Sequence, residues 1–258
     1  MTTTTRLSLW SGPRHVATAL MYAFAQRPDT QVIDEPFYGH YLRRTGAPHP
    51  GRERVLARQS LDAEAMIRER LLAPMDLPVR FVKHMTHHLV GIDLAFLSAY
   101  QHVMLIRDPR TVLPSLQSYV PQPRLLDTAY QLQYRLYHYL SERGLKPLLI
   151  QAETLRNHPE ATLRHLCDFA GLRFQPHMLC WPPGTHPDEG IWGQYWYQTL
   201  HHSSGFVPVL PESLPLAEEL EPLLEQCQAY YRPLVELALA EENRWLRVSP
   251  QPSLLTFS

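Results

Sequence analysis

The sequence predicts an α/β protein in which a parallel sheet is flanked by helices. Short apolar segments alternate with amphipathic ones between residues 6 and 174, a pattern typical of strands joined by crossover helices. The segment His102–Arg107 is nearly continuously apolar, as expected of a strand buried on both faces of a sheet. Because ligands of such sheets bind beyond the carboxyl ends of the strands, a site is expected in the residues that follow the strands.

The first strand is predicted at Arg6–Trp10 and the first helix at Val16–Gln26, in which apolar residues recur with a spacing of i, i+3, i+4 and i+7. A short second strand is expected at Gln31–Asp34. The segment 60–72 has an acidic start and basic residues further on, and its periodicity predicts an amphipathic helix.

Three more strands complete a sheet of five, and they are predicted at Val79–His84, His102–Arg107 and Lys146–Gln151. The intervening helices are predicted at Pro109–Ser118, Leu126–Arg143 and His158–Ala170. Beyond residue 175, prolines and aromatic residues become frequent, and a helical stretch at 216–240 is expected to be interrupted by Pro222 and Pro233. We interpret this part as a helical cap on the same domain.

Size and composition agree with one domain over 1–258, with a core at about 6–174 and a cap at about 175–258. The chain has 258 residues, 45% of them hydrophobic, enough for a large core. The formal net charge of −1 argues against bulk binding of nucleic acid or of an anionic membrane surface. Any anion site must therefore be local.

Cysteine content and hydropathy indicate a cytoplasmic protein. The odd number of cysteines argues against a disulfide framework, and none has a metal-like spacing: Cys167, Cys180 and Cys227. The N-terminus has no apolar stretch of signal-peptide length, and no run of about 18 apolar residues predicts a membrane span. The oligomeric state stays open.

The loop after the first strand has the layout of an anion site. A loop that enters a helix offers free backbone N–H groups and the positive end of the helix dipole. Its arginine adds a permanent charge and its threonine adds a hydroxyl in the first turn; the loop consists of Gly12, Pro13, Arg14, His15, Val16, Ala17 and Thr18. The alternative is an ordinary strand-to-helix turn with a surface arginine.

A second basic strand end follows the fourth strand. Arg107 ends that strand, and Ser115 lies about two turns into the following helix. This pair predicts a second anion site. The alternative is a helix capped by Asp108, with Arg107 in a structural ion pair.

Together, these strand ends resemble those of the sulfotransferases that use 3′-phosphoadenosine-5′-phosphosulfate (PAPS), which have a P-loop-type α/β fold. Their 5′-loop typically has the sequence Pro-Arg/Lys-Ser-Gly-Thr-Thr, where this chain has PRHVAT. Their 3′-phosphate motif has an arginine at a strand end and a serine eight residues on, like Arg107 and Ser115. The segment Pro147–Phe174 is similar to the family's strand, acidic turn and helix, and the sequence DEPF at 34–37 is similar to a motif of carbohydrate sulfotransferases.

The resemblance implies PAPS as co-substrate, no metal, and a small-molecule or carbohydrate-like acceptor that offers a hydroxyl or an amine. The loop 12–18 would then hold the 5′-phosphate, with Arg14 beside the bridging region, and Arg107 and Ser115 would bind the 3′-phosphate. A P-loop kinase or NTPase is the competing enzyme class, but the loop lacks the Gly-Lys-Ser/Thr that binds phosphates and magnesium.

The loop departs from the family pattern at three positions. Val16 replaces the usual glycine, which lets the backbone approach a phosphate closely; His15 and Ala17 replace a serine and the first threonine. These departures leave open a catalytically silent relative that keeps the fold and binds the nucleotide.

Glu35 is the first candidate for the general base that takes the acceptor proton. It follows the second strand in the motif similar to carbohydrate sulfotransferases. It could instead be structural, with Asp34 or Glu35 paired to Arg14 or Arg43. Among the residues of the third strand, Lys83 could act on the bridging oxygen.

His84 is the competing base, although strand alternation directs it to the opposite face from Lys83. His87 and His88 could be a base, substrate contacts or structural residues. The pairs His87-His88 and His201-His202 have no acidic partner or helical spacing that would support a metal. The aromatic cluster at 191–206 could pack in the cap, stack on adenine or line an acceptor pocket.

Overall fold

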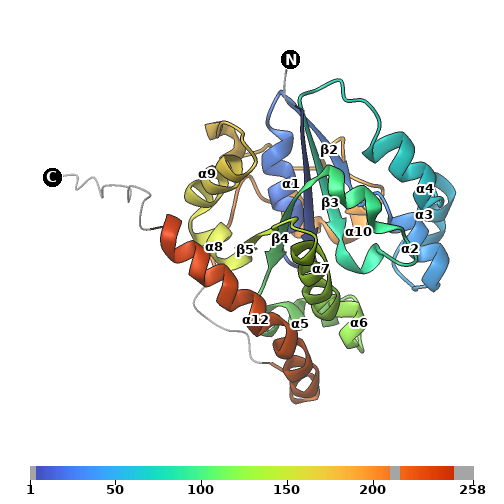
Figure 1. The fold of residues 1–258 in the computed structure, drawn as a ribbon. Helices are drawn as coiled ribbons and strands as arrows, with labels where there is room; N and C mark the ends of the chain where they lie inside the picture. The colour runs from blue at the N-terminus through green and yellow to red at the C-terminus, as the bar shows by residue number, and fades with distance from the viewer. Residues whose placement is uncertain (1–3, 210–215, 247–258) are drawn as a thin grey trace.

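The computed structural model describes residues 4–209 and 216–246, and its centre is a five-stranded parallel sheet (Figure 1). The strand order is β2-β3-β1-β4-β5. The strands are β1 (Thr5–Ser11), β2 (Thr30–Asp34), β3 (Val79–Met85), β4 (Gln101–Ile106) and β5 (Leu148–Gln151). The predicted fold class is confirmed: a parallel sheet of five strands, flanked by helices.

The strand register brings the functional strand ends to one edge of the sheet. β1 lies between β3 and β4, and its last residue, Ser11, pairs with Met85 on one side and with Leu105 on the other. Asp34 at the end of β2 pairs with Lys83 of β3. Parallel pairing therefore places the segments after four strands side by side.

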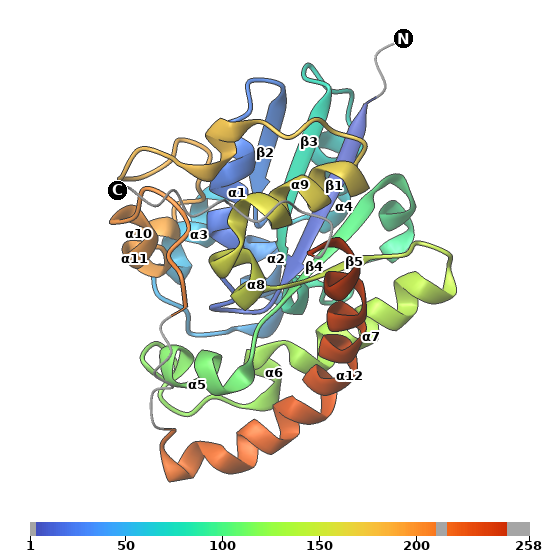
Figure 2. The ribbon, with the colours of Figure 1, turned by 90° about the vertical axis from the view of Figure 1, so that its left-hand side faces the viewer.

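Helices cover both faces of the sheet (Figure 2). One face packs against α1 (Ala17–Ala25), α8 (Ala152–Asn157) and α9 (Pro159–Phe169). The other face packs against α4 (Ala63–Met66), α7 (Tyr130–Glu142) and α12 (Glu221–Trp245). The β1 side chains alternate between these two cores, and each fully buried large apolar side chain contributes about 1.5–3 kcal/mol.

Three predicted helices differ from those observed: the helices expected at 126–143, at 60–72 and at 216–240. The helix expected at 126–143 is split into α6 (Leu125–Thr128) and α7 by Ala129, which has a left-handed φ of 65°. The helix expected at 60–72 begins after the Asp62 cap, and α4 continues as a π-helix over Ile67–Leu71.

The C-terminal helix α12 is continuous, although interruptions were expected at Pro222 and Pro233. Pro222 lies in its first turn, where a backbone N–H would have no intrahelical acceptor. The proline therefore costs the helix no hydrogen bond there. Pro233 lies inside the helix, and the helix changes direction along its course in Figure 2, as expected of an internal proline.

The remaining helices lie near the carboxyl edge of the sheet. They are α2 (Tyr38–Thr45), α3 (Arg52–Arg58), α5 (Pro109–Gln117), α10 (Gly193–Trp196) and α11 (Gln198–His201). Within the described ranges, no helix has both the length and the apolar character needed to cross a bilayer.

Candidate functional site

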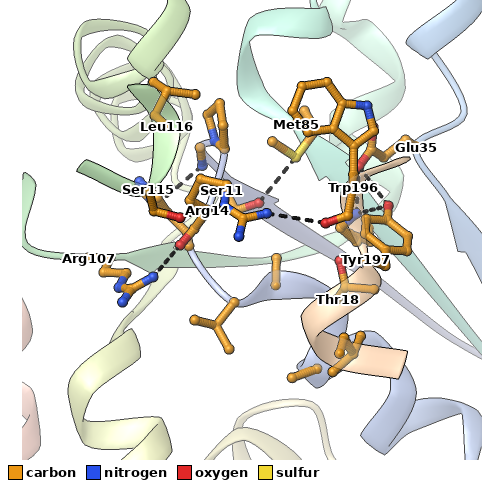
Figure 3. Close-up of a pocket in the computed structure, with 18 of the residues that line it drawn as sticks. Ser11, Arg14, Thr18, Glu35, Met85, Arg107, Ser115, Leu116, Trp196 and Tyr197 are labelled. Atoms are coloured by element: carbon orange, nitrogen blue, oxygen red, sulfur yellow. Dashed lines mark hydrogen bonds and ion pairs between the residues drawn. The ribbon is translucent and has the colours of Figure 1, made fainter. Parts of the chain in front are cut away.

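A cavity of about 450 Å³ lies at the carboxyl edge of the sheet (Figure 3). It is lined by the whole of the loop 12–18, by Arg107 and Ser115 of the second basic strand end, and by Glu35 and Lys83. The structure therefore brings all but one of the predicted site residues around one space. The exception is His84, which does not line this cavity.

His84 points into the core behind the sheet, as strand alternation requires. Its ring stacks on Trp10 with centroids 4.2 Å apart, and Nε2 lies 3.5 Å from the Ser8 hydroxyl. Burial lowers the pKa of His84 well below its ordinary value. A neutral, stacked imidazole on that face packs in the core and faces away from the cavity. This position does not suit a base that takes a proton from an acceptor in the cavity.

The loop after β1 has an unusual backbone for its residues. Arg14 and Val16 have φ angles of 65° and 67°, in the left-handed region that non-glycine residues seldom occupy. Left-handed residues within such a turn direct successive N–H groups toward one point, which suits an anion. The family's glycine would adopt this conformation without strain, and Val16 adopts it despite its branched side chain.

The buried side chain of His15 connects this loop to β4. It is 1% exposed, and its Nδ1 lies 3.3 Å from the Gly12 nitrogen and 3.1 Å from the Leu105 carbonyl oxygen of β4. Burial lowers the pKa of His15 to about 3, so the ring is neutral at neutral pH. His15 therefore ties the loop to the sheet without adding charge.

The two basic strand ends contact each other directly. Arg14 Nε donates to the Ser115 hydroxyl at 2.8 Å, and Arg107 Nη1 donates to the Arg14 carbonyl oxygen at 2.6 Å (Figure 3). Arg14 also reaches the Trp196 carbonyl at 3.2 Å and lies over the ring of Tyr119. The predicted 5′-loop and the predicted 3′-phosphate motif thus form one continuous cationic side of the cavity.

A buried ionic cluster forms the opposite side. Lys83 Nζ lies 3.0 Å from Asp34 Oδ1 and 2.6 Å from Glu35 Oε1, and all three side chains are at most 8% exposed. Both carboxylates therefore pair with Lys83. Arg14 and Arg43, the partners expected for a structural carboxylate, do not form this pair. Burying such a pair is expensive unless hydrogen bonds complete it.

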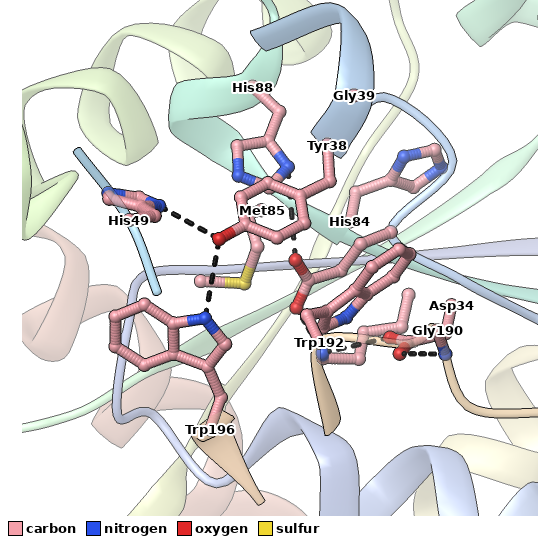
Figure 4. Close-up of polar contacts among 12 residues, drawn as sticks. Asp34, Tyr38, Gly39, His49, His84, Met85, His88, Gly190, Trp192 and Trp196 are labelled. Atoms are coloured by element: carbon pink, nitrogen blue, oxygen red, sulfur yellow. Dashed lines mark hydrogen bonds and ion pairs between the residues drawn. The ribbon is translucent and has the colours of Figure 1, made fainter. Parts of the chain in front are cut away.

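Tyr197 from the cap completes the cluster. Its hydroxyl lies 2.6 Å from Lys83 Nζ, 3.0 Å from Asp34 Oδ2 and 3.0 Å from Glu35 Oε1. Trp192 Nε1 donates to the same hydroxyl at 3.0 Å, and Figure 4 shows Trp192 beside Asp34. In the sequence, both residues lie in the aromatic cluster at 191–206, and no short motif marks either one as a partner of Glu35 or Asp34.

Glu35 combines burial with a strained backbone. Burial raises its pKa, and the charge of Lys83 opposes that rise. Its φ of 40° is left-handed, and its backbone carbonyl accepts from Gln59 Nε2 at 2.8 Å. A buried carboxyl group with a raised pKa suits proton transfer.

Aromatic and imidazole rings line the wall beside Glu35. His88 stacks on both Tyr38 and Tyr41 with centroid distances of 4.9 and 4.7 Å, and its Nδ1 lies 4.0 Å from Glu35 Oε2. Figure 4 shows His88 beside Tyr38. Burial lowers the pKa of His88 well below its ordinary value, and that of His87 to about 3. Among the described residues, no group of three or more His, Cys, Asp or Glu side chains could hold a metal ion.

Comparisons with known proteins relate the chain to one family. Residues 5–236 match the sulfotransferase domain family. Two curated relatives from Arabidopsis thaliana are the branched-chain-amino-acid aminotransferase-like protein 2, 37% identical, and protein 1, 35% identical. The matches cover 86% and 95% of this chain but only 40% and 44% of the relatives, so the chain spans less than half of their length.

A solved structure agrees in fold. The sulfotransferase domain from the Synechococcus PCC 7002 olefin synthase superposes with a TM-score of 0.51 at 17% identity, over 88% of this chain and 95% of that one. At this identity the similarity establishes the fold alone. The match over 5–236 and the motifs around the cavity lead to the same conclusion: this chain belongs to the sulfotransferase family.

Proposed function

We propose that this chain transfers a sulfuryl group from PAPS to a hydroxyl or amine of a small-molecule acceptor. The observation that carries the proposal is the shared cavity, in which the loop 12–18 and Arg107 face the same space as Glu35. A clamp for anions and a buried carboxylate within about 450 Å³ suit a donor and a reacting group of an acceptor.

The polar groups of the cationic side fit the donor. The first N–H groups of a helix have no intrahelical acceptors, and the Thr18 hydroxyl has no hydrogen-bond partner among the described residues. Arg107 Nε is buried and makes no hydrogen bond within the described ranges, although Glu153 Oε1 lies 3.9 Å away. This ion pair, and the Asp108 cap on α5, are the features expected of the structural alternative, and they leave Arg107 Nε available for a hydrogen bond to a phosphate. The loop would hold the 5′-phosphate and Arg107 with Ser115 the 3′-phosphate, once Arg14 releases the Ser115 hydroxyl.

During transfer, the acceptor oxygen forms a bond to sulfur while the bond from sulfur to the bridging oxygen of the 5′-phosphate breaks. The acceptor proton passes to the carboxylate of Glu35, and 3′-phosphoadenosine-5′-phosphate leaves. Negative charge develops on the bridging oxygen, where Arg14 and the loop amides stabilise it. Lys83 and Tyr197 hold the Glu35 carboxylate in place through bonds of 2.6 and 3.0 Å.

The proposal is tested by ligand stabilisation followed by transfer. We expect 3′-phosphoadenosine-5′-phosphate to raise the melting temperature, with about 2.7 kcal/mol of stabilisation at a concentration 100 times Kd. Stabilisation by ATP with magnesium alone would support a kinase or NTPase and overturn the proposal. Labelled PAPS is then incubated with pooled metabolites; donor binding without transfer to any acceptor would favour a catalytically silent relative.

A further inference from the structure

A second, larger cavity adjoins the site. Its volume is about 1,050 Å³, at the upper end of the range for small-molecule sites. Six residues line both cavities, so the two meet there: Tyr41, His49, His87, Val120, Asp127 and Trp196. We name the second cavity the acceptor groove; its other walls come from residues 45–50, from the turn after β3, from 119–126 and from α7.

The walls of the acceptor groove are mainly apolar. On α7, Leu132, Leu136 and Tyr139 recur at i, i+4 and i+7 and present one stripe to the groove. The turn after β3 contributes Leu89 and Val90, and further apolar residues are Leu94, Val120, Pro48, Pro50 and Pro121. A long hydrocarbon would bury its surface against this lining.

Several polar groups in the groove are already engaged or exposed, whereas the buried Nδ1 of His87 has no hydrogen-bond partner among the described residues. The Thr45 and Thr86 hydroxyls donate to the carbonyls of Tyr41 and Ser11 at 2.8 and 3.1 Å. Arg124 pairs with Asp127 at 3.4 Å, and Arg135 is exposed. Since each buried sugar hydroxyl needs a hydrogen-bond partner, this lining disfavours a carbohydrate.

The groove leads to the proposed base. Tyr41 and His87, which line it, contact the ring of His88, with centroids 4.7 and 4.5 Å away. His88 Nδ1 lies 4.0 Å from Glu35 Oε2. Burial lowers the pKa of both His87 and His49, so these imidazoles at the junction favour the neutral form. The rings between the groove and Glu35 along this wall are therefore neutral, and Asp127, which lines both cavities, pairs with Arg124 at 3.4 Å.

We propose that the acceptor groove binds the long apolar part of an alcohol whose hydroxyl reaches Glu35. The inference rests on the proposed function and narrows its acceptor from small molecules in general to elongated, largely apolar alcohols. The donor occupies the cationic side, and the alcohol enters from the opposite side, between α7 and the turn after β3.

The test measures binding of straight-chain primary alcohols of two to twelve carbons to the protein saturated with 3′-phosphoadenosine-5′-phosphate, by calorimetry. Full burial predicts an affinity that rises by up to about fourfold per methylene until the groove is filled. The kcat/KM for sulfation of the same alcohols should rise in parallel. An affinity that does not depend on chain length would overturn the inference.

A charged side chain in the wall of the acceptor groove should remove the dependence of alcohol affinity on chain length. Leu132→Glu on α7 and Val90→Lys on the opposite wall should each weaken dodecanol binding at least tenfold while leaving ethanol and the bisphosphate nucleotide unaffected. The matched control is Leu239→Glu on α12, where the leucine is exposed and lies outside both cavities. If both groove variants bind dodecanol like the wild type, the inference fails.

The same titrations, repeated without the nucleotide and with the nucleotide alone, separate this inference from the proposed function. Alcohol binding that depends on chain length, without any affinity for the bisphosphate nucleotide, would leave the groove assignment intact and overturn the donor assignment. Nucleotide binding and PAPS turnover with only short, polar acceptors would leave the proposed function intact and overturn the groove assignment.

Discussion

The two sides of the cavity are built by different means. The cationic side, for which donor binding is proposed and which is called the donor side below, consists of the loop 12–18 with Arg107 and Ser115, and it offers backbone amides and guanidinium groups. The opposite side, called the acceptor side below, consists of the cluster of Glu35, Lys83 and Tyr197 with buried neutral histidines, and it is distinct from the acceptor groove. The first side combines two short motifs, each next to a strand end, whereas the second depends on burial and on contacts between side chains that no motif connects.

Removal of the proposed base should have the largest effect. We expect Glu35→Gln to lower kcat by about 10²–10⁴-fold, because the acceptor proton loses its acceptor, with little change in nucleotide affinity. In the wild type, burial raises the pKa of Glu35, so kcat should fall with decreasing pH at a value above the ordinary range of a glutamate. A variant with full activity would move the base to another residue.

Removal of a donor-side cation should affect binding instead. Arg107→Ala should weaken the affinity for 3′-phosphoadenosine-5′-phosphate by about 10²-fold or more, the effect expected for a charge-assisted contact to a phosphate. The measurement is calorimetric titration. Arg110→Ala is the matched control, since Arg110 lies three residues further along the chain in the first turn of α5, is about two-fifths exposed and does not line the cavity. Equal loss in both variants would contradict a specific clamp.

The buried neutral histidines should make the fold sensitive to acid. The folded pKa is lowered, to about 3 for His15 and His87 and about 4 for His102, while the unfolded value is near 6.5. Between these values the unfolded chain binds more protons, so the free energy of unfolding should fall as pH drops below about 6.5, by up to about 1.4 kcal/mol per pH unit per histidine.

Urea unfolding between pH 7.5 and 5.5 measures this slope. His87→Gln, on the acceptor side, and His15→Gln, on the donor side, should each reduce it by the share of one histidine. An unchanged slope in the His87 variant would mean that this ring is already protonated or exposed in the folded protein.

The smallest effect is expected at Val16. Val16→Gly removes a left-handed strain of about 1–2 kcal/mol but loses packed methyl groups and frees the unfolded chain, so stability should change by less than about 1 kcal/mol. Ala17→Gly, the neighbouring change inside the helix, should destabilise by about 0.5–1 kcal/mol. Greater destabilisation by Val16→Gly than by Ala17→Gly would show that the valine side chain itself is needed.

The sequence located the residues of the donor side more completely than those of the acceptor side. The loop 12–18 and the pair Arg107 and Ser115 have fixed spacings next to strand ends, and parallel pairing necessarily brings those ends together. Glu35 was predicted from its motif, but its partner was not. Lys83 contacts it across 48 residues, and Tyr197 across 162.

The sequence by itself determined the sheet, its five strands and the places of the loop 12–18 and the pair Arg107 and Ser115 at the strand ends, because hydrophobic periodicity and short motifs act over a few residues. Only the tertiary structure decided that Val16 adopts a left-handed conformation, that Ala129 breaks a helix, and that Tyr197 closes the cluster around Glu35 and Lys83. It also decided which histidines are neutral, since a pKa depends on burial and on neighbours that the chain brings together only when it folds.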